Sequence, residues 1–189
     1  MRATAALFAI LTTLVGAHDA FAQSAGVFLG VASNAANGGA DSGGGKGPDL
    51  GIMVETPVSP EKRIRFDVTR TSWHAQDVDY RGAVSSADDV TLTTVRLSLV
   101  RARRLGNRVG MYGGVGAGGY HYDMKHTMVS HHWRAGILAF FGLEFPFCDR
   151  RCAIDAEVRL HVAGGPHTYP LWQVDLSKAD AAIGMKVRF

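Results

Sequence analysis

Apolar and polar residues alternate with a period of two along most of the chain, most clearly over residues 177–189. In this stretch one row of alternate positions is apolar, and the other row is small or basic. The apolar row is Ala181, Ile183, Met185, Val187 and Phe189, and the other is Ala182, Gly184, Lys186 and Arg188. Successive side chains of a β-strand point to opposite faces, so this pattern predicts a strand with one apolar and one polar face.

Eight segments of the chain read as strands. They cover residues 25–32, 49–56, 61–73, 90–102, 108–122, 133–145, 152–163 and 177–189. Most have the length, roughly 9–11 residues, that a tilted strand needs to cross a membrane. The predicted connections alternate between long (33–48, 74–89, 123–132, 164–176) and short (57–60, 103–107, 146–151). This asymmetry is typical of membrane barrels, so we predict an all-β fold, an eight-stranded antiparallel up-and-down transmembrane β-barrel.

Alternation alone does not show which face of the barrel points inward, because a soluble barrel with an apolar interior has the same period. Two observations favour a polar interior: the polar rows are rich in glycine, and their charges nearly balance. Buried charges must be paired, which a balanced set allows. The predicted lumen charges are Glu55, Asp67, Glu144, Asp155 and Glu157 with Arg63, Arg65, Arg96, Arg159, Lys186 and Arg188. Aromatic residues near the strand ends, including Trp73, Trp133 and Phe145, suit a membrane interface.

The first 22 residues read as a cleaved signal peptide. Arg2 precedes an apolar stretch over residues 3–16, and Ala20-Phe21-Ala22 fits the small-x-small rule for cleavage after Ala22. The apolar stretch is shorter than the roughly 20 residues of a membrane-spanning helix, which disfavours an N-terminal anchor. We therefore divide the chain into a signal peptide, 1–22, and one barrel domain, 23–189.

Charge and cysteine content narrow the possible partners. The formal net charge is +3, but the basic residues are scattered rather than clustered, which argues against a nucleic-acid partner. Cys148 and Cys152 flank three residues, and an exported chain meets an oxidising compartment, so we predict a disulfide between them. Two free thiols or half of a metal site are the alternatives.

Three sequence features that could indicate nucleotide binding, metal binding or lipid hydrolysis are better explained as structural features. Gly114, Gly116 and Gly119 match a dinucleotide-binding spacing, but the pattern continues as a strand and no helix follows. Histidines around the predicted long loops, among them His121, lack the fixed geometry of a zinc site, so we predict no metal and no cofactor. His161-Val162-Ala163 has alanine where a lipid deacylase would need its serine nucleophile, and we predict no catalytic residue.

The Ala20-Phe21-Ala22 signal, the strand 113–122 and the terminal Lys186-Val187-Arg188-Phe189 together resemble the small, OmpA/OmpX-type outer-membrane barrels of Gram-negative bacteria. The resemblance implies an integral outer-membrane protein, folded by the barrel-assembly machinery, in which Phe189 belongs to the assembly signal. A barrel of eight strands is filled by its own side chains, so a wide pore is not expected.

From this resemblance we expect a structural or surface-interaction role. The four long loops would meet lipopolysaccharide, outer-membrane lipids or an extracellular ligand. Two alternatives stay open at this point. One is a lipid A deacylase-like enzyme with His161 or His121 as its base, and the other is a soluble periplasmic barrel that binds an apolar ligand.

Overall fold

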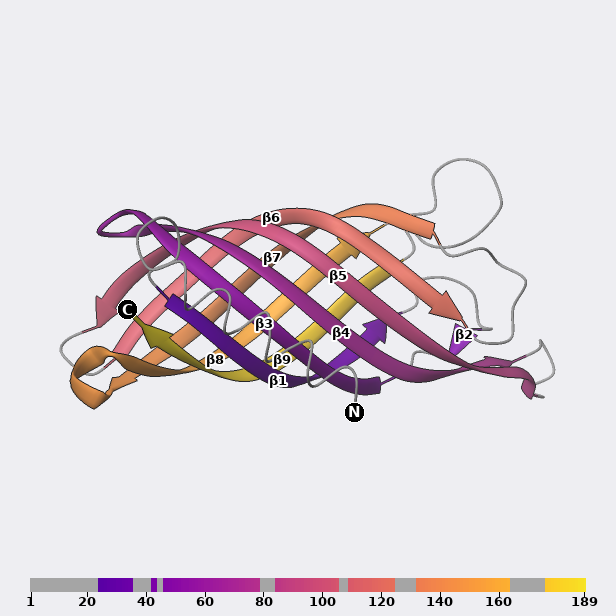
Figure 1. The fold of residues 1–189 in the computed structure, drawn as a ribbon. Helices are drawn as coiled ribbons and strands as arrows, with labels where there is room; N and C mark the ends of the chain where they lie inside the picture. The colour runs from indigo at the N-terminus through magenta and orange to yellow at the C-terminus, as the bar shows by residue number, and fades with distance from the viewer. Residues whose placement is uncertain are drawn as a thin grey trace.

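In the computed structural model, eight long antiparallel strands form one closed barrel (Figure 1). The structure describes residues 24–35, 42–43, 46–78, 84–105, 109–124, 132–163 and 176–189. The strands are β1 (Ser24–Ala35), β2 (Ser42–Gly43), β3 (Lys46–Ser59), β4 (Lys62–Val78), β5 (Val84–Leu105), β6 (Val109–Met124), β7 (His132–Phe147), β8 (Cys152–Ala163) and β9 (Leu176–Arg188). The short β2 pairs with β4 and is not one of the eight strands that form the barrel wall.

The first and last strands close the barrel. β1 pairs antiparallel with β9 along its whole length, from Ser24 opposite Arg188 to Ala35 opposite Ser177. The other strands of the barrel wall pair in chain order, with β4 paired to β5 and β8 paired to β9. The predicted eight-stranded antiparallel barrel and its closure by the terminal strand are therefore confirmed.

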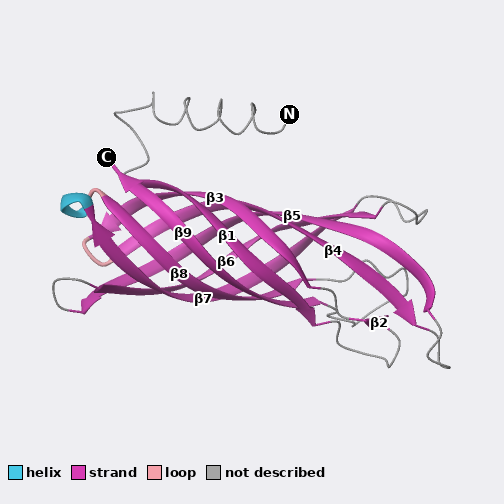
Figure 2. Ribbon diagram, turned by 90° about the horizontal axis from the view of Figure 1, so that it is seen from below, coloured by secondary structure: helices cyan, strands magenta, loops and turns pink. Residues whose placement is uncertain are grey.

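The short connections and the C-terminus lie at one end of the barrel, and the long connections lie at the other. We call these the short-turn end and the long-loop end. The single turn of 3-10 helix, η1 (Cys148–Arg150), lies beside the C-terminus at the short-turn end (Figure 2). Pro60 and Glu61 form another of its turns, between β3 and β4.

One predicted loop was wrong in extent. Residues 74–89 were expected to connect two strands, but β4 continues to Val78 and β5 already begins at Val84. The paired backbones satisfy each other's hydrogen bonds along this extension without any need for an apolar face. The alternation of apolar and polar residues, on which the prediction rested, therefore stops before the strands do.

The apolar rows face outward and the polar rows face inward. Leu29, Leu97, Ile137, Leu160 and Ile183 are each more than half exposed on the outer face. The inner face buries Arg65, Arg96 and Lys186 almost completely. A soluble barrel with an apolar interior would have the reverse arrangement, so the structure contradicts that alternative.

Glycines on the inner face make room for large side chains from neighbouring strands. A Cβ placed on Gly142 would lie 2.5 Å from the Tyr112 hydroxyl, and one on Gly114 would lie 2.5 Å from Phe140 Cζ. Tyr112 and Phe140 belong with Val100 and Leu138 to a small apolar cluster inside the barrel. Since β6 continues to Met124, Gly114, Gly116 and Gly119 are strand positions and not a phosphate-binding loop.

Candidate functional site: the charged lumen and its short-turn mouth

The lumen near the short-turn end is built around Glu55 of β3. Arg65 Nε donates a hydrogen bond to Glu55 Oε1 at 2.8 Å, and Lys186 Nζ lies 3.3 Å from Glu55 Oε2. Arg63 Nη1 lies 3.2 Å from the same oxygen. Arg65 also pairs with Glu157 of β8, so these groups join strands β3, β4, β8 and β9 across the barrel.

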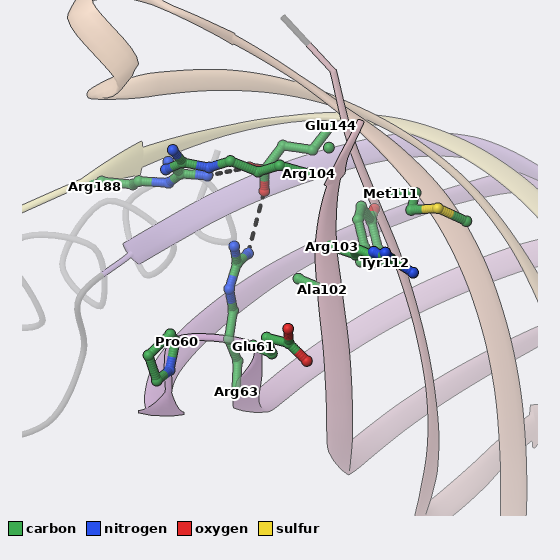
Figure 3. A pocket seen from close by; sticks show the side chains of 11 residues that line it. Pro60, Glu61, Arg63, Ala102, Arg103, Arg104, Met111, Tyr112, Glu144 and Arg188 are labelled. Carbon is green, nitrogen blue, oxygen red and sulfur yellow. Dashed lines mark hydrogen bonds and ion pairs between the residues drawn. The ribbon is translucent and has the colours of Figure 1, made fainter. Parts of the chain in front are cut away.

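Glu144 of β7 closes the network at the short-turn mouth. Arg63 Nη1 lies 3.2 Å from Glu144 Oε2, and both Lys186 and Arg188 pair with the same carboxylate. The guanidinium groups of Arg63 and Arg188 reach Glu144 from two different sides (Figure 3). Lys186 also lies 3.3 Å from Asp155, so it bridges three carboxylates when Glu55 is included.

A second cluster occupies the part of the lumen nearer the long-loop end. Asp49 of β3 accepts a hydrogen bond from Lys178 Nζ at 3.0 Å, and Arg159 Nη1 lies 3.4 Å away from it. Asp180 of β9 lies 2.9 Å from His161 Nε2 and 3.3 Å from Lys178 Nζ. All five side chains are at least nine-tenths buried, so each charge depends on its neighbours for stabilisation.

Aromatic and basic side chains connect these two clusters. Arg159 pairs with Glu157 of the first cluster, and its guanidinium carbon lies 3.7 Å above the centre of the Phe28 ring. Arg96 donates from Nε to Asp67 at 2.6 Å and approaches His161 at 3.2 Å. A cation over an aromatic face is stabilised by the ring quadrupole, so Phe28 gives Arg159 an apolar but favourable wall.

All eleven predicted lumen charges lie on the inner face. Only Arg63 and Arg188, which lie at the short-turn mouth, are partly exposed. Sequence reasoning missed Asp49, Lys178 and Asp180 as network members. Asp49 shares its parity with Glu55, and Lys178 and Asp180 share theirs with Lys186, so the same period-two pattern would have found them.

Solved structures with the same architecture support the reading of the fold. No family model and no curated protein sequence matches the chain. Neisserial surface protein A superposes with a TM-score of 0.67 at 16% identity, covering 88% of this chain and 96% of that one. The chain has the fold of the small eight-stranded outer-membrane barrels.

Two further structures share this barrel. The outer-membrane protein OprG from Pseudomonas aeruginosa superposes with a TM-score of 0.59 at 11% identity, covering 89% of this chain and 98% of that one. Ail, the attachment invasion locus protein of Yersinia pestis, gives 0.50 at 16% identity, with 89% and 99% covered. At these identities the likeness concerns the fold.

Cys148 and Cys152 are free thiols in the structure, which does not contain the predicted disulfide. Cys148, Asp149 and Arg150 all have positive φ angles (48°, 52° and 70°), so the turn between them is left-handed. A hydrogen bond with Cys152 raises the pKa of the Cys148 thiol above its usual range. The disulfide therefore stays a prediction.

Phe189 and His121, which the sequence singles out, lie outside the lumen. Phe189 follows β9 in the outward apolar row and is about half exposed. His121 packs against Trp133, with 5.2 Å between the ring centres. His126, His131, His167 and the signal segment 1–22 lie outside the described residues. Among the residues that the structure describes, no group of three or more His, Cys, Asp or Glu side chains is arranged to hold a metal ion.

His161, the candidate base of the enzyme alternative, lies inside the lumen. Its ring nitrogens contact Arg96, Tyr120 at 3.1 Å and Asp180 at 2.9 Å, and the side chain is almost fully buried. Ala163, where a serine would be needed, is also buried. A lipid acyl chain would lie against the opposite, outer face, so this histidine fills a structural position in the network.

No helix among the described residues has both the length and the apolar character needed to cross a membrane.

Proposed function

We propose that the protein is an integral barrel of the bacterial outer membrane. It serves as a structural anchor that presents its long-loop end at the cell surface. The observation that carries this proposal is the inside-out distribution of polarity, with a broad apolar outer surface around a lumen packed with ion pairs. Water would not cover such a surface favourably, whereas a bilayer covers it and a closed barrel leaves no backbone edge unpaired.

The proposed surface role rests on the asymmetry of the two ends. The strand ends that flank the connections 36–45, 79–83, 125–131 and 164–175 all lie at the long-loop end, opposite the C-terminus. In outer-membrane barrels the longer loops are extracellular and the turns are periplasmic. Two neighbours of like fold are called a surface protein and an attachment invasion locus protein, which agrees with this role. Lipopolysaccharide, membrane lipids or an extracellular ligand would be the partners.

The lumen does not suit a diffusion channel. Arg65, Arg96, Tyr120 and Lys186 are each at least 98% buried by their neighbours. Arg65 and Lys186 meet at Glu55, and Arg96 and Tyr120 meet at His161, so the lumen is filled at both positions. Side chains fill an eight-stranded interior, in contrast to the open channel of larger porins. The proposal therefore assigns the barrel an anchoring role, with no catalytic residue and no cofactor.

Membrane extraction and electrophoresis test the proposal together. The protein should stay with the membrane pellet after washing with alkaline carbonate. It should also migrate differently on a gel before and after boiling, because the folded barrel resists detergent. A protein that carbonate releases and that shows no such shift would contradict the proposal. Protease added to whole cells should cut the chain only at the long-loop end.

Assembly into the membrane is the second part of the proposal. Phe189 ends the closing strand on its lipid-facing side and would be read by the barrel-assembly machinery. Removing Phe189 should reduce the fraction of newly made protein that becomes resistant to extraction, whereas Phe189→Tyr, which keeps an aromatic ring, should assemble normally. Equal assembly of the truncated and full chains would remove Phe189 from this role.

A further inference from the structure

A cavity opens at the short-turn mouth of the barrel, at the end opposite the proposed surface loops. Its volume is about 330 Å³, and its wall includes Arg63, Arg103, Arg104, Tyr112, Glu144 and Arg188 (Figure 3). A small recess of about 20 Å³ adjoins it and adds Arg150 to the lining while sharing Arg104, Glu144 and Arg188. The cavity is thus a concave site built from strands β4, β5, β6, β7 and β9.

The charges of this wall do not cancel. Four arginines line the cavity, against Glu61 and Glu144. Glu144 is already bound by Arg63, Lys186 and Arg188, and Glu61 pairs with Arg101 at 3.2 Å. Both carboxylates are therefore occupied by cations before any ligand arrives.

Arg103 and Arg104 carry the excess positive charge. Both side chains are exposed, and neither makes an ion pair with any residue in the described part of the chain. They follow each other near the end of β5, so their side chains leave the strand on opposite sides, and both residues line the cavity. Guanidinium groups present several donors in one plane and match the oxygens of a phosphate or carboxylate in pairs.

The inner part of the wall holds the Tyr112 hydroxyl, which is buried beside Glu157. The Arg65 guanidinium carbon lies 5.1 Å and Lys186 Nζ 5.4 Å from the centre of the Tyr112 ring. Both cations are paired with buried carboxylates of the lumen network. The unpaired positive charge of the cavity therefore lies at its rim, on Arg103 and Arg104.

We propose that the short-turn mouth is a binding site for a phosphate group, with Arg103 and Arg104 as its main ligands. A focused positive potential in a concave site concentrates anions. Its occupant has two possible sources: the phosphate of a lipid head group from the adjoining leaflet, or a soluble phosphate ester. Leu105, Phe145 and Phe147 are exposed at the same end, so acyl chains would lie beside the rim.

Calorimetric titration of inorganic phosphate into the detergent-refolded full barrel, at low ionic strength, tests the soluble source. The wild-type protein should bind saturably, and the Arg103→Ala/Arg104→Ala variant should bind at least about tenfold more weakly, since two charge-assisted hydrogen-bonding groups are lost. Lys62→Ala is the matched control, because Lys62 is an exposed cation at the same end of the barrel and does not line the cavity. Its affinity should stay within about twofold of wild type.

Nanodiscs containing equal parts of phosphatidylglycerol and phosphatidylcholine test the lipid source. Native mass spectrometry of released barrels should show retained phosphatidylglycerol on the wild type and on Lys62→Ala, but not on Arg103→Ala/Arg104→Ala. Selective loss in either assay supports the site and identifies its source. If the double variant matches wild type in both assays, or if Lys62→Ala loses binding equally, the proposal is overturned. An unchanged boiling-dependent gel shift shows that each variant is folded.

Discussion

Neutralising Glu157 should destabilise the barrel more than any single surface change. Its carboxylate is almost fully buried and bonds both Arg65 and Arg159, which are themselves buried. Glu157→Gln keeps the shape of the side chain but removes its charge. Breaking a buried pair from one side costs about 3–5 kcal/mol, because the remaining charge loses its compensation. Arg65 keeps Glu55 at 2.7 Å and Arg159 keeps Asp49 at 3.4 Å, so we expect the lower end, about 3 kcal/mol.

Equilibrium urea unfolding of the barrel in lipid vesicles measures this loss. Glu61→Gln is the control, because it also removes one partner of a Glu–Arg ion pair, but the Glu61–Arg101 pair is mostly exposed. Exposed pairs contribute about 0–1 kcal/mol. The double variant Glu157→Leu/Arg159→Leu should be more stable than Glu157→Leu alone, since it removes one of the orphaned charges. If Glu157→Gln falls within about 1 kcal/mol of the control, the lumen charges are not stabilised by pairing.

Three further changes probe the outer face, the inner packing and the short-turn end. Val158→Arg puts a charge at the middle of the outward row of β8 and should lower the unfolding free energy by about 2–4 kcal/mol, as measured by urea titration in vesicles. Gly142→Val would push against the Tyr112 ring and should cost about 1–3 kcal/mol in the same assay; no loss would mean that the ring can move away. Reduced Cys148 has a raised pKa, so iodoacetamide should alkylate it more slowly than a free cysteine at pH 8 and faster as pH rises. Protein purified from an oxidising periplasm should be 2 mass units lighter if Cys148 and Cys152 are joined, roughly the two hydrogens lost per disulfide.

The sequence predicts the strands and their faces well because both depend on local parity. Ile183 and Met185 face outward and Lys186 faces inward, as the alternation in the last strand indicates. Parity does not give the partners of each charge. The pairing of Lys178 with Asp49 joins residues 129 positions apart and depends on the register at which β9 meets β1 and β1 meets β3.

The long-loop end was harder to predict for a different physical reason. Inside a membrane the outward side chains must be apolar, which imposes the alternation. Beyond the membrane, strands β4 and β5 need only their mutual backbone hydrogen bonds, so polar residues continue the hairpin as far as Val78 and Val84. The cavity at the short-turn mouth could not be predicted from the sequence either, because its arginines come from three strands, β4, β5 and β9, that only the barrel brings together.

The pairing of β1 with β9 sets a constraint on the order in which the chain can become a barrel. β1 is synthesised first, yet one of its two edges acquires a partner only after Arg188 has been added. Until then, that edge offers unpaired N–H and C=O groups to any other strand, including the same strand of a second copy. Contacts between residues so distant along the chain also form slowly. Between export and closure of the barrel, this protein therefore most needs a chaperone that keeps the free edge of β1 from pairing with another strand.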